Sequence, residues 1–403
     1  MVRYIPFFTL AFLILGAGHV YLYRRLVRDT TQDVRLRRFG LLVTVLLAMV
    51  LIVGRILQRL APGTFSDVVA GVGYVWMGVA LFLFLTLLSF DAVRGVQHIV
   101  RRFPRQRPSS TPAASGSAAS VTDPVDPSRR LFLARASAGT AAAIASSASG
   151  YGAWRAYHPP SISEVVLKVP KLPRTLEGFT IVQLTDIHVG NLIERRFLDE
   201  LVRVANSAKP DLVAITGDLV DGGVDELGRS VAALRGLKSR FGSYFVTGNH
   251  EYYAGVREWT AFLLSVGVQV LRNRRVPIGD GGGTFDLIGV DDWRGGRFTG
   301  EGTYDLDAAI AGRDPDKAAV LLAHQPANFD VARTKGVDVQ LSGHTHGGQL
   351  FPLTFLVGLG WEYSAGHYER DGAHIYVSRG CGFWGPPMRV GSPPEVVKVV
   401  LTT

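Results

Sequence analysis

Three long uncharged stretches dominate the first part of the chain. They cover 4–23, 39–54 and 68–90, and a helix needs about 17 to 25 mostly apolar residues to cross a bilayer core. The first and third stretches are long enough. The middle one reaches this length if it continues past Arg55, whose side chain can extend to the interface; a buried core helix is the alternative there. The pattern predicts three membrane-spanning helices within residues 1–103.

Basic residues are distributed unevenly around these stretches. Up to residue 135 the chain has 17 Arg, no Lys and 6 Asp, whereas the remainder has a net charge of −2. Arginine-rich loops remain on the cytoplasmic side of a membrane, and here they lie between the first two stretches and after the third. We therefore expect these loops inside and the N-terminus outside. The net charge of +9 thus indicates membrane topology and no nucleic-acid partner.

The composition changes after the third stretch. Residues 104–127 are rich in Pro, Ser, Ala and Thr without an apolar period, which indicates a flexible linker. Residues 128–154 begin with Ser-Arg-Arg-Leu-Phe-Leu and continue as an uncharged Ala/Ser/Gly run. This start resembles a twin-arginine export signal placed inside the chain. The alternative is an ordinary fourth membrane helix with basic flanks, and either would carry residues 160–403 across the membrane.

The second half of the chain has a different period. Beyond Pro159 and Pro160, short β-branched runs alternate with segments of helical period, which is typical of an α/β domain. We predict strands over 179–184, 211–216, 244–247, 285–290, 318–322, 337–341, 374–378 and 396–401, and helices over 194–207 and 227–238.

Length and composition indicate more than one folding unit, with part of the chain in a membrane. The chain of 403 residues exceeds the usual size of one soluble domain. Its hydrophobic share of 47%, against 19% charged residues, is too high for an ordinary soluble or disordered chain. The single cysteine, Cys381, excludes an intramolecular disulfide and a cysteine-rich zinc site.

Residues with carboxylate, amide or imidazole side chains follow five of the predicted strands. In α/β folds, ligands collect at the carboxyl ends of the strands. Oxygen and imidazole ligands without thiolate suit Mn, Fe or Zn, so these positions predict a metal site. The residues are Asp186, His188, Asp218, Asp221, Asn249, His250, Glu251, His324, His344 and His346.

Taken in order, these motifs resemble those of the calcineurin-like metallophosphoesterase family. DxH at 186–188, GDxxD at 217–221, GNHE at 248–251, His324 and GHxH at 343–346 follow the order of the family. The resemblance covers the chain beyond about residue 165 and implies a four-layer α/β/β/α sandwich, here preceded by an all-α transmembrane region. The C-terminal segment is similar to a bacterial membrane-associated subgroup that also carries twin-arginine signals.

The resemblance also implies two divalent metal ions, with Mn, Zn or Fe expected and the identity left open. His250 would stand beside them without binding metal, as the acid or the phosphate-orienting group; the alternative is that it only positions Asn249. The implied ligands are Asp186, His188 and His346 for one ion, Asn249, His324 and His344 for the other, and Asp218 for both.

Three further features leave alternatives open. Asp221 stands where purple acid phosphatases place a tyrosine, which argues against a tyrosine-bound ferric ion and leaves Asp221 to hydrogen-bond a backbone group or a ligand. The apolar run 350–361 could be a lipid-facing lip of the site or a buried loop or strand closing the core. Arg379 and Arg389 could clamp a phosphate, or either could pair with Glu395.

Together these features predict a metal-dependent phosphoesterase in the cell membrane, with its catalytic domain on the extracytoplasmic side. The expected partners are membrane lipids and a phosphorylated small-molecule, lipid-linked or cell-envelope substrate, with no nucleic acid. A nucleotide or cyclic-nucleotide phosphodiesterase is the alternative enzyme. A membrane receptor with a structural or sensing metal site is the non-enzymatic alternative.

Overall fold

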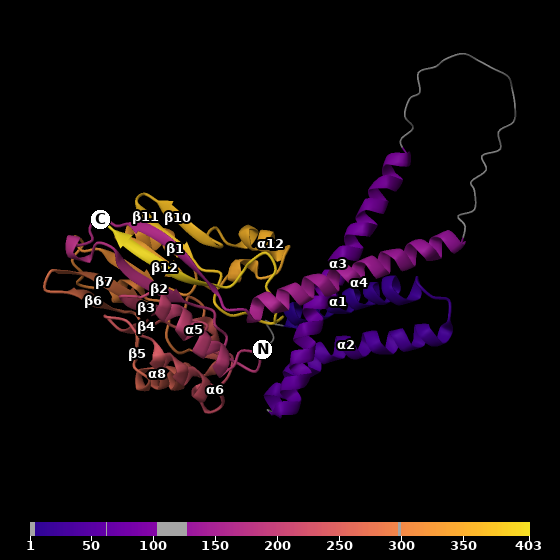
Figure 1. Ribbon diagram of the computed structural model, residues 1–403, viewed down its shortest axis with the longest axis horizontal. Coiled ribbons are helices and arrows are strands. Elements are labelled where there is room, and N and C mark those ends of the chain that lie inside the picture. Colours follow the sequence, from indigo (N-terminus) through magenta and orange to yellow (C-terminus); the bar gives the residue numbers. More distant parts are fainter. Residues whose placement is uncertain (1–4, 62, 103–126, 297–299) are drawn as a thin grey trace, which may run out of the picture. The chain divides into compact units, whose positions relative to one another are not determined.

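The structure, a computed structural model, describes residues 5–61, 63–102, 127–296 and 300–403 (Figure 1). It divides into two compact units, Met1–Gly150 and Tyr151–Thr403, which are described separately. The predicted linker at 104–127 lies outside the described residues except for its last residue.

The first unit is helical. It contains α1 (Ile5–Tyr23), the short π-helix η2 (Arg24–Arg28), α2 (Val34–Leu60), α3 (Thr64–Arg102) and most of α4 (Pro127–Tyr157). Within the described residues, Val34–Gln58 and Thr64–Val100 are long and apolar enough to cross a membrane, judged by length and composition. The first stretch forms a helix too, and its role as a third span stays a prediction.

Polar contacts join the ends of these helices. The Asp33 carboxylate accepts hydrogen bonds from the backbone N–H groups of Arg35 and Leu36 at the start of α2, which satisfies donors that lack a partner within the helix. Asp91 of α3 accepts from the Tyr21 hydroxyl at 2.7 Å and from the Arg25 guanidinium at 2.8 Å. The end of α1 and the start of the first loop are thus tied to α3.

The second unit contains two six-stranded sheets, whose strand orders are β1-β12-β2-β3-β4-β5 and β10-β11-β9-β8-β7-β6. In the first sheet β2 to β5 run parallel, and in the second β7, β8, β9 and β11 run parallel. The bounds are β1 Ser161–Lys168, β2 Phe179–Leu184, β3 Leu212–Ile215, β4 Ser243–Phe245, β5 Val268–Val270, β6 Arg274–Asp280, β7 Gly283–Gly289, β8 Ala319–Leu322, β9 Val339–Ser342, β10 Gly366–Arg370, β11 Ala373–Val377 and β12 Glu395–Thr402.

Helices cover the outer face of each sheet. The first sheet packs on α5, α6 and α8, and the second sheet packs on α10 and α11. Between them, apolar side chains from both sheets form a shared core. The helices are α5 Arg195–Ser207, α6 Val224–Val231, α7 Asn249–Ala254, α8 Val256–Ser265, α10 Leu306–Ile310, α11 Phe329–Thr334 and α12 Leu353–Gly360.

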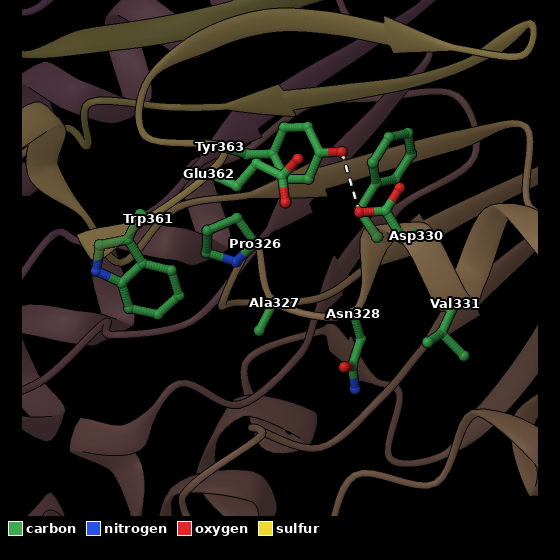
Figure 2. A pocket seen from close by; sticks show the side chains of 9 residues that line it. Pro326, Ala327, Asn328, Asp330, Val331, Trp361, Glu362 and Tyr363 are labelled. Carbon is green, nitrogen blue, oxygen red and sulfur yellow. Dashed lines mark hydrogen bonds between the residues drawn. The ribbon is translucent and has the colours of Figure 1, made fainter. Parts of the chain in front are cut away.

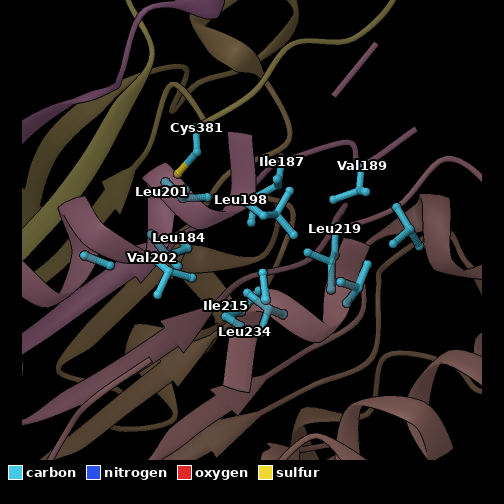
Figure 3. Close-up of a cluster of buried hydrophobic side chains, with 14 of the residues drawn as sticks. Leu184, Ile187, Val189, Leu198, Leu201, Val202, Ile215, Leu219, Leu234 and Cys381 are labelled. Carbon is cyan, nitrogen blue, oxygen red and sulfur yellow. The ribbon is translucent and has the colours of Figure 1, made fainter. Parts of the chain in front are cut away.

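Alternation along the strands produces these layers, because successive side chains of a strand point to opposite faces. In β2, Ile181 points into the core between the sheets, while Val182 and Leu184 face the helices. Leu184 meets Leu198 and Leu201 of α5 in the cluster drawn in Figure 3. The predicted four-layer α/β/β/α sandwich is confirmed.

All eight predicted strands form, and the predicted helix 227–238 is α6 followed by a 3-10 turn, Ala232–Gly236. Four strands were not predicted: β1, β5, β6 and β10. All four lie at sheet edges. The side chains of β1 and β10 are mostly exposed, so these two strands lack the apolar run of a buried strand. The core interpretation of 350–361 is wrong for α12, because α12 has no buried residue.

Candidate metal centre

The loops that follow β2, β3, β4, β8 and β9 carry all the site residues predicted from the sequence. The loops after β2 and β3 are joined by backbone hydrogen bonds, from Asp186 N–H to Gly217 O and from His188 N–H to Asp218 O, each 3.1 Å. Asp186 also accepts the His344 backbone N–H at 3.0 Å. These bonds bring loops of both sheets together at one rim.

One group of candidate ligands consists of Asp186, His188 and His346, all buried, with one ligand atom each within 4.8 Å of the others. The Nε2 atoms of His188 and His346 are 3.1 Å apart, and His346 Nε2 is 3.4 Å from an Asp186 oxygen. Three donor atoms this close suit one cation.

A second group consists of Asp218, His324 and His344. His324 Nε2 lies 3.1 Å from Asp218 Oδ2 and 3.1 Å from His344 Nδ1. The same Asp218 oxygen lies 3.9 Å from His188 Nε2 of the first group. Asp218 is therefore placed between the two groups, as a shared ligand would be.

Asn249 supplies an independent test of whether a cation fits. Its side-chain oxygen is buried and has no hydrogen-bond partner among the described residues. A buried oxygen without a partner destabilises a fold by about 1 to 3 kcal/mol, and a bound cation would satisfy it. The residues present therefore fit a metal centre, with Asn249 as the oxygen ligand that the resemblance implies.

The backbone of the rim is strained in a consistent way. Five of the expected ligands adopt positive φ angles, which residues other than glycine rarely adopt, and each costs about 1 to 3 kcal/mol unless the surroundings enforce it. Such strain is concentrated at functional sites. The residues and their φ angles are Asp186 51°, His188 54°, Asp218 49°, His344 72° and His346 51°.

Comparisons with known proteins agree with this geometry. Residues 179–348 match the family model described as calcineurin-like phosphoesterase. The uncharacterized metallophosphoesterase YkuE of Bacillus subtilis is 31% identical, over 68% of this chain and 97% of its own length. The chain belongs to the calcineurin-like metallophosphoesterase family.

Other known proteins are matched over a smaller share of their own length. The bovine "transmembrane protein with metallophosphoesterase domain" is 39% identical over 69% of this chain, and the chain spans only 64% of that relative's length. Among solved structures, the 5'-nucleotidase precursor of Thermus thermophilus is 18% identical with a TM-score of 0.34, over 55% of this chain and 54% of that one.

Asp221 fixes two imidazole rings of the metallophosphoesterase site. Its Oδ1 lies 2.9 Å from His188 Nδ1 and 2.6 Å from His250 Nδ1. Desolvation opposes ionisation, but the His188 and His250 rings lower the pKa of Asp221 below its ordinary value. The sequence left a backbone group or a ligand as the partner of Asp221, and in the structure its carboxylate hydrogen-bonds His188, an expected metal ligand, and His250.

The buried carboxylates require positive charge nearby. Burial raises the pKa of Asp186, whereas the His324 and His250 imidazoles, acting against burial, lower the pKa of Asp218. Burial and His324 lower the pKa of His344 to about 3, which leaves this ring neutral, as a metal ligand must be. The imidazoles around Asp218 thus compensate its charge, and bound cations would compensate it as well.

Glu251 has a positioning role that its motif alone did not reveal. Its buried carboxylate accepts backbone N–H groups from Gly248 at 2.6 Å, Leu219 at 2.8 Å and Asp218 at 3.1 Å. It thereby ties the Asn249 loop to the Asp218 loop. Its bond to the Gly248 N–H, three residues back at the start of α7, is the half of a capping box that a glycine N-cap allows.

Asp292 was also missed. It is buried behind the site, and it accepts hydrogen bonds from the Gln325 amide and from the backbone N–H groups of Arg294 and Gly295. Gln325 directly follows the candidate ligand His324. Asp292 follows the predicted strand 285–290, so its position after a strand end was the available signal.

Both arginines considered for phosphate binding have partners within the protein. The Arg379 guanidinium pairs with Glu395 at 3.2 Å, as one of the sequence alternatives had it. Arg389 is fully buried and donates to the backbone carbonyl oxygens of Gly382 and His346. The prediction that Arg389 binds a phosphate is therefore wrong.

Aromatic side chains surround the open side of the site. The rings of Tyr253 and Trp384, both more than half exposed, lie 5.5 and 6.2 Å from that of His250. Trp361 lies 5.3 Å from His344 and also lines a cavity of about 270 Å³. Figure 2 shows this cavity, which includes Asp330, hydrogen-bonded by the Tyr363 hydroxyl.

Replacement of the shared carboxylate is the direct test of this arrangement. In Asp218→Ala we expect metal affinity to fall by more than about 100-fold, since even residues that only orient ligands are worth 10- to 100-fold, and two cations without a shared anion repel each other. Metal analysis of the purified protein measures the result. Asp280→Ala, which removes an exposed carboxylate paired with Arg240, should keep full metal content; unchanged metal in Asp218→Ala would refute the shared ligand.

Proposed function

We propose that this chain hydrolyses phosphate-ester or pyrophosphate bonds with a dinuclear metal centre. The observation that carries the proposal is the position of Asp218 Oδ2 between two groups of buried imidazoles, 3.1 Å from His324 and 3.9 Å from His188. The proposed ligands are Asp186, His188 and His346 for one ion, Asn249, His324 and His344 for the other, and Asp218 for both.

Each protein group then has a definite task. Two bound divalent cations would neutralise phosphoryl charge and lower the pKa of a water molecule for attack on phosphorus. His250 is the proposed proton carrier, since the Asp218 and Asp221 carboxylates, against the effect of burial, raise its pKa to about 9. Its Nε2 is 3.9 Å from Asp218 Oδ2, so it can donate to a phosphoryl or leaving-group oxygen. Asp221 orients the His250 ring.

We further propose that the catalytic domain lies outside the cytoplasmic membrane, in a multi-pass protein. The two apolar helices, Val34–Gln58 and Thr64–Val100, support membrane insertion, and the arginine distribution supports cytoplasmic loops on both sides of this pair. The twin-arginine-like start of residues 128–154 supports export of the catalytic domain. Relatives from Bos taurus and Danio rerio are named as transmembrane proteins with a metallophosphoesterase domain.

The proposed substrate is lipid-linked or cell-envelope phosphate. Support comes from α12, whose apolar side chains are exposed: Phe355 is 72% exposed, Leu356 54% and Leu359 84%. The helix begins seven residues after His346 and ends next to Trp361, the residue that contacts His344. An apolar surface beside a phosphate-binding site fits a substrate that joins a phosphate to an acyl or polyprenyl chain.

A substrate screen tests the proposed reaction. The purified full chain, supplied with Mn, Zn, Fe or Mg, should release phosphate from mono-, di- or pyrophosphate esters. His250→Ala should keep both metals and lose about 10²- to 10⁴-fold in turnover, the usual effect of removing a proton-transfer group. Loss of metal in His250→Ala would make His250 a ligand, and a fully metallated wild-type chain inactive on every ester class would refute the hydrolase.

Two leucines of nearly equal exposure test the substrate class. Leu356 is 54% exposed on α12 and Leu264 is 52% exposed on α8. Leu356→Ser should weaken kcat/KM for a long-chain phosphate ester by up to about tenfold, because each buried methylene is worth about 0.8 kcal/mol, and should leave a short soluble ester unaffected. Leu264→Ser should change neither. Equal kinetics of wild type and Leu356→Ser on the long-chain ester would remove the support that α12 gives.

Reporter fusions test the topology. A reporter active only outside the cytoplasm should work after Thr403 and fail within 108–127. Replacing Arg129 and Arg130 by Lys separates the two export routes. A twin-arginine signal requires arginine, whereas the positive-inside rule is satisfied by lysine as well as by arginine. Activity of the fusion within 108–127 would show that the topology is the reverse of the one proposed. Normal export of the double-lysine variant would rule out the twin-arginine signal and identify residues 128–154 as an ordinary membrane helix.

A further inference from the structure

The last turns of α4 pack into the apolar core of the second unit, Tyr151–Thr403, which is called the catalytic unit below. Ala156 is fully buried in the same cluster as Leu198 and Leu201 of α5. The ring of Tyr157 meets the ring of Phe383 edge-on at 5.2 Å. These turns of α4 are therefore held by the catalytic unit through apolar burial and not by chain connection alone.

Gly152 brings the helix backbone against the segment 388–390. Its carbonyl oxygen accepts the Arg389 backbone N–H at 2.9 Å. A Cβ atom at Gly152 would lie 3.1 Å from Met388 Cβ and 2.8 Å from Val390 Cγ2, and the second distance is closer than real carbon contacts allow. A side chain at Gly152 would therefore require Val390 and Met388 to shift.

Arg389 connects this contact to a candidate metal ligand. Its side chain is fully buried, and its guanidinium donates to the His346 carbonyl oxygen at 3.1 Å and lies 3.1 Å from the His346 ring Nδ1. The Gly382 carbonyl accepts the Arg389 Nε–H at 2.9 Å. A buried guanidinium held by carbonyl groups on both sides is a rigid support.

His346 needs such a support because its backbone is strained. Its φ of 51° is unfavourable for a residue with a side chain, and such conformations persist only where several contacts enforce them. The His346 carbonyl accepts three hydrogen bonds, from the Arg389 guanidinium at 3.1 Å, from the Ser392 hydroxyl at 2.6 Å and from the Gln349 backbone N–H at 3.0 Å. The contact of α4 with segment 388–390 acts on one of these three bonds, the one from Arg389.

We propose that Gly152 and Arg389 are positioning residues for the metal centre: the end of α4 holds Arg389, and Arg389 holds His346 in its ligand position. The inference rests on the proposed function in that it takes His346 as a metal ligand. The end of α4 then supports the metal centre in addition to connecting it to the preceding part of the chain. A chain cut after Gly152 would lose part of that support.

A matched pair of glycines in α4 tests this. A Cβ atom at Gly150 would meet nothing within 4 Å, in contrast to Gly152, so both substitutions remove a helical glycine but only one displaces segment 388–390. In the full chain, Gly152→Leu should weaken binding of one of the two metal ions by about 10- to 100-fold, the usual effect of losing a group that orients a ligand. Gly150→Leu should bind both ions as the wild type does.

Metal titration of the purified variants against a chelator gives the readout, with thermal unfolding of the metal-free proteins beside it. If Gly152→Leu does not fold, the milder variant Gly152→Ala is measured in its place. Arg389→Met should reproduce the loss of one ion, and Arg389→Lys, which keeps a donor, should recover part of it. Two ions bound with wild-type affinity in Gly152→Ala and Arg389→Met would overturn the inference, whereas a wild-type chain without metal would refute the proposed function itself.

Discussion

The burial of Asp218 is the constraint on which the rest of the site depends. Its side chain is almost completely buried, between the imidazoles of His188 and His324. A carboxylate removed from water remains ionised only if positive charge compensates it. The metal-binding geometry and the raised pKa of His250 both depend on this charge, because His324, His188 and His250 lie 3.1, 3.9 and 3.9 Å from Asp218 Oδ2.

The surrounding fold is arranged to keep that charge in place. Glu251 binds the backbone on both sides of the rim, Asp221 fixes His188 and His250, and Arg389 fixes His346. These contacts enforce left-handed backbone conformations that residues other than glycine rarely adopt. The two sheets supply the rigid base, since their shared core holds the strand ends from which the loops start.

The parts that could be predicted from the sequence are those encoded locally. Ligands such as Asp186 and His188 directly follow an apolar strand, so strand pattern and motif order together located them. The role of Arg389 could not be assigned, because its partner His346 is distant in the chain and the contact depends on tertiary packing. The exposure of α12 was undecided for a related reason: an apolar run has the same composition whether it faces the core or the surface.

Anomalous X-ray scattering from crystals of the purified chain, measured at the Mn, Fe and Zn absorption edges, tests the central claim most directly. The account predicts two anomalous peaks about 3.5 to 4 Å apart, the usual spacing of a dinuclear centre, with Asp218 in contact with both and His250 in contact with neither. A single peak, or a peak bound by His250, would contradict it.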